Sequence, residues 1–97
     1  TASLFPGSPL LRDDGGHYFA AIDVPEKGWR LTITPSGLKA AGLIVVMVLG
    51  SGKAEALHRV LAGEFDPIKF PAQMLKACRD KVVWLVDEDA AAKFLGT

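Results

Sequence analysis

The stretch LIVVMVLGSGKAEALHRVL, residues 43–61, decides the fold of this chain. It opens with seven consecutive apolar residues, rich in β-branched types and too few to span a bilayer. Such a run predicts a strand buried on both faces, as in parallel sheets covered by helices. After Gly50-Ser51-Gly52, a helical pattern places Ala54, Leu57 and Leu61 on one face. The stretch therefore predicts a strand, a tight glycine turn and a helix.

The junction between this strand and this helix is a predicted anion site. Ligands of open α/β sheets bind at the carboxyl ends of the strands, and helix N-termini attract anions. Lys53, in the first helical turn, adds a positive charge beside amides that Gly52 leaves exposed. A Walker A phosphate loop does not fit, because Met47 stands at its first glycine position and Ala54 replaces the required Ser or Thr.

The composition fits one small globular domain. The 97 residues are 49% apolar, and 11 Lys and Arg balance 11 Asp and Glu. A net charge of zero argues against a nucleic-acid-binding or polybasic membrane surface. The single cysteine, Cys78, cannot form an internal disulfide, which favours a reducing compartment. We therefore expect a cytoplasmic protein that binds a small molecule and neither nucleic acid nor membrane.

The remaining elements are expected to alternate along the chain. Strands are expected at residues 17–24, 29–34 and 82–86, the first two as a possible antiparallel pair. Helices are expected at residues 35–41, 71–78 and 88–95. Thr34 is the expected N-cap of the first helix, and Asp87 that of the last. The alternation favours an α/β fold with a mainly parallel sheet, and the few covering helices suggest one side of a larger domain.

Five motifs, in the same order, resemble those of the glucosamine-6-phosphate isomerase and 6-phosphogluconolactonase superfamily. They are TASLFPG (1–7), WRLTIT (29–34), GSGKA (50–54), PAQML (71–75) and WLVDEDAA (84–91). The first resembles the segment that follows the Asp-Gly-His signature of the lactonases, and it departs from the isomerase sequence at that place. The resemblance covers essentially the whole chain and favours the lactonases.

The resemblance implies a doubly wound, three-layer αβα Rossmann-like sandwich, with residues 1–97 as the C-terminal part of a single domain. The implied reaction is hydrolysis of 6-phosphogluconolactone to 6-phosphogluconate in the pentose phosphate pathway, without a metal or organic cofactor. The implied general base is the Asp-Gly-His histidine, expected just before Thr1. This chain would then hold no catalytic residue and be inactive alone, and its own N-terminal fragment is a candidate partner.

The resemblance also implies substrate-binding residues. Lys53 would contact the substrate phosphate, with Gly52 in the same turn. Arg30, at the start of a strand, could reach the same anion or pair with a surface carboxylate. Thr1 and Ser3 would lie beside the missing histidine and could shape the lactone pocket, although exposed loop hydroxyls more often have no such role.

Other polar residues have structural interpretations. His17 and His58 lack a nucleophile or carboxylate at a telling spacing, and Cys78 reads as a small buried group. The acidic run at residues 87–89 suits a helix start better than a metal cluster.

Three other functions stay open on the sequence alone. A related sugar-phosphate isomerase or deaminase would carry different acid and base residues upstream. A non-catalytic sugar-phosphate-binding domain would share the fold. A complete small interaction module would unfold cooperatively by itself.

Overall fold

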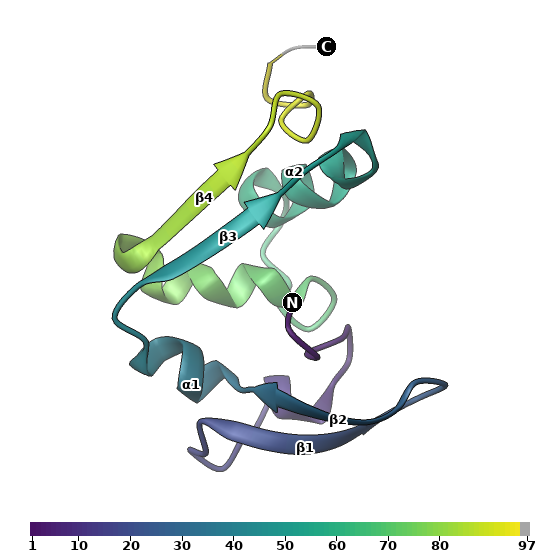
Figure 1. Ribbon diagram of the computed structural model, residues 1–97, viewed down its shortest axis with the longest axis vertical. Coiled ribbons are helices and arrows are strands. Elements are labelled where there is room, and N and C mark those ends of the chain that lie inside the picture. Colours follow the sequence, from purple (N-terminus) through teal and green to yellow (C-terminus); the bar gives the residue numbers. More distant parts are fainter. Residues whose placement is uncertain (96–97) are drawn as a thin grey trace.

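The computed structural model describes residues 1–95, which form a mixed α/β structure with two separate two-stranded sheets (Figure 1). In one sheet, β1 (Phe19–Val24) pairs antiparallel with β2 (Gly28–Ile33). In the other, β3 (Ile44–Val48) pairs parallel with β4 (Val82–Val86). The α-helices are α1 (Pro35–Ala40) and α2 (Ala54–Ala62), and the 3-10 helices are η1 (Pro9–Leu11), η2 (Ser51–Lys53) and η3 (Pro71–Lys81). The parallel pair is confirmed, but the described residues do not form the single, mainly parallel sheet that the alternation predicts.

The hairpin and the helix that follows it agree with the predictions from sequence. Thr34 is the N-cap of α1, and its Oγ1 accepts a hydrogen bond of 3.1 Å from the Gly37 amide. Pro35 occupies the first helical turn, where its missing N–H costs nothing. Gly37 is needed because a Cβ there would collide with the Tyr18 carbonyl and the Ile33 side chain. The helix thus packs directly on the end of the hairpin.

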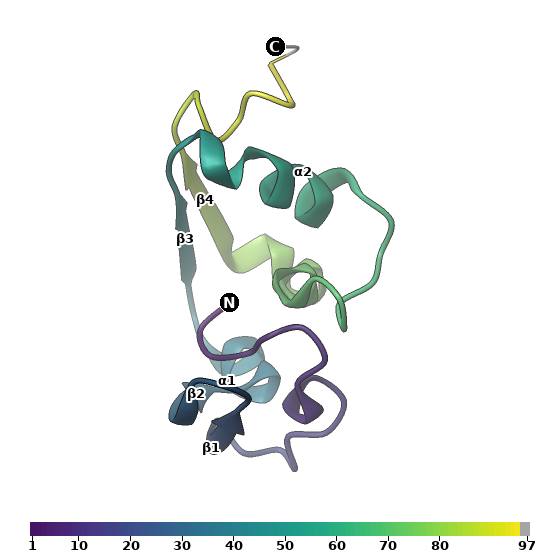
Figure 2. The same ribbon diagram turned by 90° about the vertical axis from the view of Figure 1, so that its right-hand side faces the viewer.

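The inner face of the β3–β4 sheet is covered by α2 and η3, which lie on the same side of it (Figure 2). Leu57 of α2 and Leu75 of η3 are buried, and Trp84 of β4 is half-buried beside them. η3 extends to Lys81, three residues beyond the expected helix, with a kink at Cys78. This layer forms most of the small core.

The outer face of the same sheet is bare. Its exposed apolar side chains alternate along β3 and β4 and are Leu43, Val45, Met47, Leu49, Val83 and Leu85. The expected burial of the central strand on both faces is therefore wrong for residues 1–95, because helices cover only one of its faces. We call these six residues the outer apolar face. None of the helices in the described part of the chain is long and apolar enough to cross a membrane.

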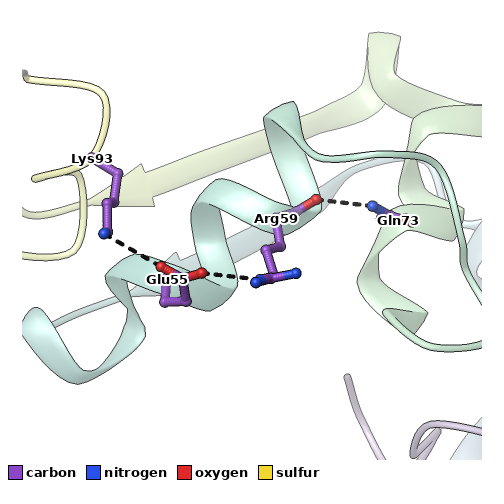
Figure 3. Close-up of polar contacts among 4 residues, drawn as sticks. All are labelled: Glu55, Arg59, Gln73 and Lys93. Atoms are coloured by element: carbon purple, nitrogen blue, oxygen red, sulfur yellow. Dashed lines mark hydrogen bonds and ion pairs between the residues drawn. The ribbon is translucent and has the colours of Figure 1, made fainter.

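Polar contacts hold α2 to its neighbours (Figure 3). Glu55 lies 3.0 Å from Arg59 one turn away, as the spacing predicts, and 3.4 Å from Lys93. Hydrogen bonding to Arg59 and then to Lys93 lowers the pKa of Glu55. Gln73 is fully buried and donates to the Arg59 and Glu64 carbonyls at 2.9 and 3.0 Å, so it ties η3 to the end of α2.

The prediction of a helix at residues 88–95 is wrong. These residues form successive turns, although Asp87 does accept a hydrogen bond from the Ala90 amide at 2.8 Å, as an N-cap would. Short helices form in proteins mainly when packing buries an apolar face. Phe94 and Leu95 are exposed instead and only Ala90 of this segment is fully buried, which is too little apolar surface to support a helix.

Candidate functional site

The turn after β3 has the geometry of an anion site. Lys53 is the last residue of η2 and the N-cap of α2. Gly50 has a φ of +92°, a conformation that L side chains rarely adopt. Gly52 lacks a positive φ, and a Cβ added there would meet open space. Neither backbone strain nor packing within the described residues therefore requires glycine at position 52.

Two amides of this turn are available to a ligand. The Lys53 and Ala54 amides donate within the turn, to the carbonyls of Gly50 and Ser51. The Ser51 and Gly52 amides have no acceptor within residues 1–95, as is usual at a helix start. Lys53 is exposed and forms no ion pair in the same part of the chain. Two N–H donors and one ammonium group therefore stand at the carboxyl end of β3.

Thr1 lies close to Lys53, although 52 positions separate them in the sequence. Both residues line a cavity of about 160 Å³. The walls of this cavity come mostly from the inner sheet face, α2 and η3, through Val46, Val48, Ala56, Leu57, Val60, Ala72 and Trp84. The cavity is apolar apart from its Thr1 and Lys53 edge.

Ser3 and Arg30 do not line the cavity that holds Lys53. The Ser3 amide donates to Thr32 Oγ1 at 3.1 Å, and Ser3 faces another cavity, of about 210 Å³, beside β1. Arg30 is exposed on β2, on the same strand face as Thr32, and within residues 1–95 it has no carboxylate partner. The structure thus places Thr1 and Lys53 on one cavity, with Gly52 next to Lys53 along the chain, and leaves Ser3 and Arg30 outside that cavity.

One contact in this region, between Asp87 and Gly50, is not predicted by the sequence. Asp87 follows β4, and both of its carboxylate oxygens lie 3.1 Å from the Gly50 amide. The sequence identifies it only as a helix cap. The signal that could have found this contact is an acidic residue directly after the second parallel strand, because parallel strands end at the same edge.

The other titratable residues lie elsewhere. The His58 ring packs on Phe94 with centroids 5.2 Å apart, and Cys78 is buried in η3. Among residues 1–95, no three His, Cys, Asp or Glu side chains gather closely enough to hold a metal ion.

Comparison with known proteins gives the family. The family model described as glucosamine-6-phosphate isomerases/6-phosphogluconolactonase matches residues 1–84. The chain belongs to this family. Members related to it include a 6-phosphogluconolactonase from Synechocystis sp., 33% identical over 90 residues that cover 93% of this chain. A glucosamine-6-phosphate deaminase from Clostridium perfringens is 40% identical over 75 residues, 76% of this chain and 29% of its own length.

A solved structure of the family has the same fold. The 6-phosphogluconolactonase from Trypanosoma brucei superposes with a TM-score of 0.74 at 26% identity, over 92% of this chain and 35% of its own. The chain also covers 36% of the Synechocystis relative, so it spans about a third of the length of the curated relatives it matches. Its assignment to their C-terminal part stays a prediction, as does the three-layer sandwich.

Proposed function

We propose that this chain forms the phosphate-binding part of a 6-phosphogluconolactonase. The observation that carries the proposal is the turn after β3, where Lys53 follows the Ser51 and Gly52 amides, which have no acceptor within residues 1–95. Lys53 also shares a cavity with Thr1. A sugar phosphate has an anionic end that such a group binds well, since ammonium and helix-start amides both stabilise phosphate oxygens. The open space at Gly52 lets a phosphate approach the backbone.

The proposed reaction is hydrolysis of the lactone ester by water, without a metal or organic cofactor. Lys53 anchors the phosphate, and Thr1 lies at the edge of the space for the lactone ring. Arg30 and Ser3 belong to the proposal more weakly, because the cavity of Lys53 does not include them. The general base is a histidine outside this chain, so the residues here bind and orient the substrate.

The choice of a lactonase over a deaminase has two supports. TASLFPG at residues 1–7 resembles the lactonase sequence, and the Synechocystis lactonase matches over 93% of the chain against 76% for the deaminase. A deaminase or isomerase is the second candidate, because its match has the higher identity. A non-catalytic sugar-phosphate-binding domain would use the same turn.

The proposal includes a larger domain. The outer apolar face is what a covering layer of helices would bury, as in a three-layer αβα sandwich. We place this chain toward the C-terminal end of that longer polypeptide, with the N-terminal part as its packing partner and the cytoplasm as its location.

Turnover by the full-length polypeptide tests the proposal. We expect acid release from 6-phosphogluconolactone, far slower turnover of unphosphorylated gluconolactone, and no ammonia from glucosamine 6-phosphate. Ammonia release would replace the proposal with a deaminase. Binding of 6-phosphogluconate without turnover of either substrate would indicate a non-catalytic domain.

A further inference from the structure

Asp87 joins the ends of the two parallel strands. It follows β4 directly, and its own amide donates to the Val48 carbonyl, the last residue of β3, at 3.4 Å. Its carboxylate then accepts the Gly50 amide with both oxygens at 3.1 Å and the Ala90 amide at 2.8 Å. One side chain therefore fixes the backbone on both sides of the sheet edge from which Lys53 projects.

The position of Gly50 explains why this contact matters. Gly50 adopts a φ of +92° at the point where the chain leaves β3 and turns into η2. A glycine in this region is free to adopt many other conformations, so the turn needs an external restraint to keep one geometry. The carboxylate of Asp87 supplies it and so restrains the turn that carries the Ser51 and Gly52 amides.

The segment that carries Asp87 is held by two further contacts. Lys93 lies 3.4 Å from Glu55 in the first turn of α2, and Phe94 packs on the ring of His58. These two contacts hold residues 87–95 against the first half of α2, which begins directly after the turn. No cation pairs with Asp87 within residues 1–95, so backbone amides are the groups that its carboxylate binds.

We propose that Asp87 is a positioning residue that holds the Gly50–Lys53 turn in the geometry that binds phosphate. This inference rests on the proposed function, because the ligand is the phosphate of that substrate. The inference also predicts the direction in which phosphate affinity changes when Asp87 is replaced. A carboxylate near an anion site repels the anion, so removing a mere neighbouring charge would tighten binding. Removing a positioning residue weakens it.

The test compares variants of the full-length enzyme. We expect Asp87→Ala to raise KM for 6-phosphogluconolactone about tenfold with a much smaller change in kcat, and to leave turnover of unphosphorylated gluconolactone unchanged. Asp87→Asn keeps one acceptor oxygen and is expected to raise KM by less. In a Lys53→Ala background, Asp87→Ala should raise KM by a smaller factor than in the wild type, because the turn that Asp87 positions has already lost one of its phosphate-binding groups.

The matched control is Glu88→Ala, which removes the same charge one residue later and has no bond to Gly50. Its KM should equal that of the wild type. A KM for both Asp87 variants that equals or falls below that of the control would overturn the inference. If Asp87→Ala fails to fold, Asp87→Asn decides the outcome, since it changes the charge but keeps an acceptor.

Inorganic phosphate gives a readout that needs no turnover. Titration followed by the amide NMR shifts of Ser51 and Gly52 should show weaker binding in both Asp87 variants. A wild type that binds phosphate at these amides without lactonase activity would refute the proposed function and leave this inference standing. Phosphate binding that is independent of Asp87 would refute the inference whatever the activity.

Discussion

At the scale of single residues, the turn after β3 contains two glycines, Gly50 and Gly52, that differ in what requires them. Gly50 is required by its backbone conformation, with a φ of +92°. Gly52 has no such conformation and no neighbour within 4 Å of a Cβ, so nothing within the described residues requires glycine there. Lys53 follows with an exposed ammonium group. Open space at Gly52 beside this ammonium group supports the proposal that the turn binds a ligand.

Replacing Lys53 tests that assignment most directly. Lys53→Ala in the full-length enzyme is expected to raise KM for 6-phosphogluconolactone about 10- to 100-fold, because a hydrogen bond to a charged group contributes roughly 1.5–3 kcal/mol. The melting temperature should stay the same, since the side chain has no ion pair in the described residues. Steady-state kinetics and thermal unfolding measure the two effects.

The control for this substitution is Lys39→Ala, which removes the same charge from α1. Both kinetic constants should match those of the wild type. If Lys53→Ala leaves KM for the phosphorylated lactone unchanged, Lys53 does not bind the phosphate.

At the scale of elements, α1 shows how side chains fix a short helix. Its six residues are too few to be stable alone. Thr34 caps it, and the Asp14 carboxylate accepts the Ser36 amide and hydroxyl, each at 2.7 Å. The hydrogen bonds from Ser36, first from its amide, lower the pKa of Asp14 to about 2 from 3.8. The loop before β1 is thereby tied to the start of the helix.

This tie predicts a pH dependence. The pKa of Asp14 is lower in the folded state than in the unfolded one, so its stabilising effect is complete above about pH 4 and is lost as the pH falls toward about 2. The NMR shift of the Asp14 carboxyl carbon should titrate near 2. Ser36→Ala removes the hydroxyl donor and should move the midpoint part of the way toward 3.8. A midpoint that starts near 3.8 in the wild type would contradict the tie.

At the scale of the whole molecule, the structure is extended and partly uncovered. Its radius of gyration is 13.9 Å, against about 12.5 Å for a compact domain of this length. The two sheets are separate, and both expose large apolar side chains; on the hairpin, Trp29 is 70% and Leu31 is 77% exposed. Monomeric proteins rarely leave such contiguous patches open. This exposed apolar surface supports the proposal that the chain packs as one part of a larger domain.

A double substitution on the outer apolar face should benefit the isolated 97-residue chain and harm the full-length polypeptide. Met47 and Leu85 are cross-strand partners on it. Changing both to Lys should make the 97-residue chain less prone to self-association, because charge replaces exposed apolar surface. In the full-length polypeptide the same change should lower the melting temperature by several degrees or prevent folding, because it buries two charges. Light scattering and thermal unfolding measure these outcomes. A full-length protein that tolerates both lysines would show that no layer covers this face.

The sequence by itself determined the features that depend on neighbours along the chain. The apolar runs located β3 and β4, Thr34-Pro35 located the start of α1, and Gly50 to Gly52 located the turn that follows β3. These follow from periodicity, capping and backbone freedom, which act over a few residues. The helix expected at residues 88–95 failed because a short helix needs a buried apolar face, and in this segment only Ala90 is fully buried.

Only the tertiary structure decided which distant residues meet. It separated the strands into two sheets, left one face of β3 bare, and placed Thr1 beside Lys53 but Arg30 and Ser3 outside that cavity. It also paired Asp87 with Gly50 across 37 residues. Such contacts are set by how strands dock and which surfaces are covered, and a local sequence pattern by itself fixes neither.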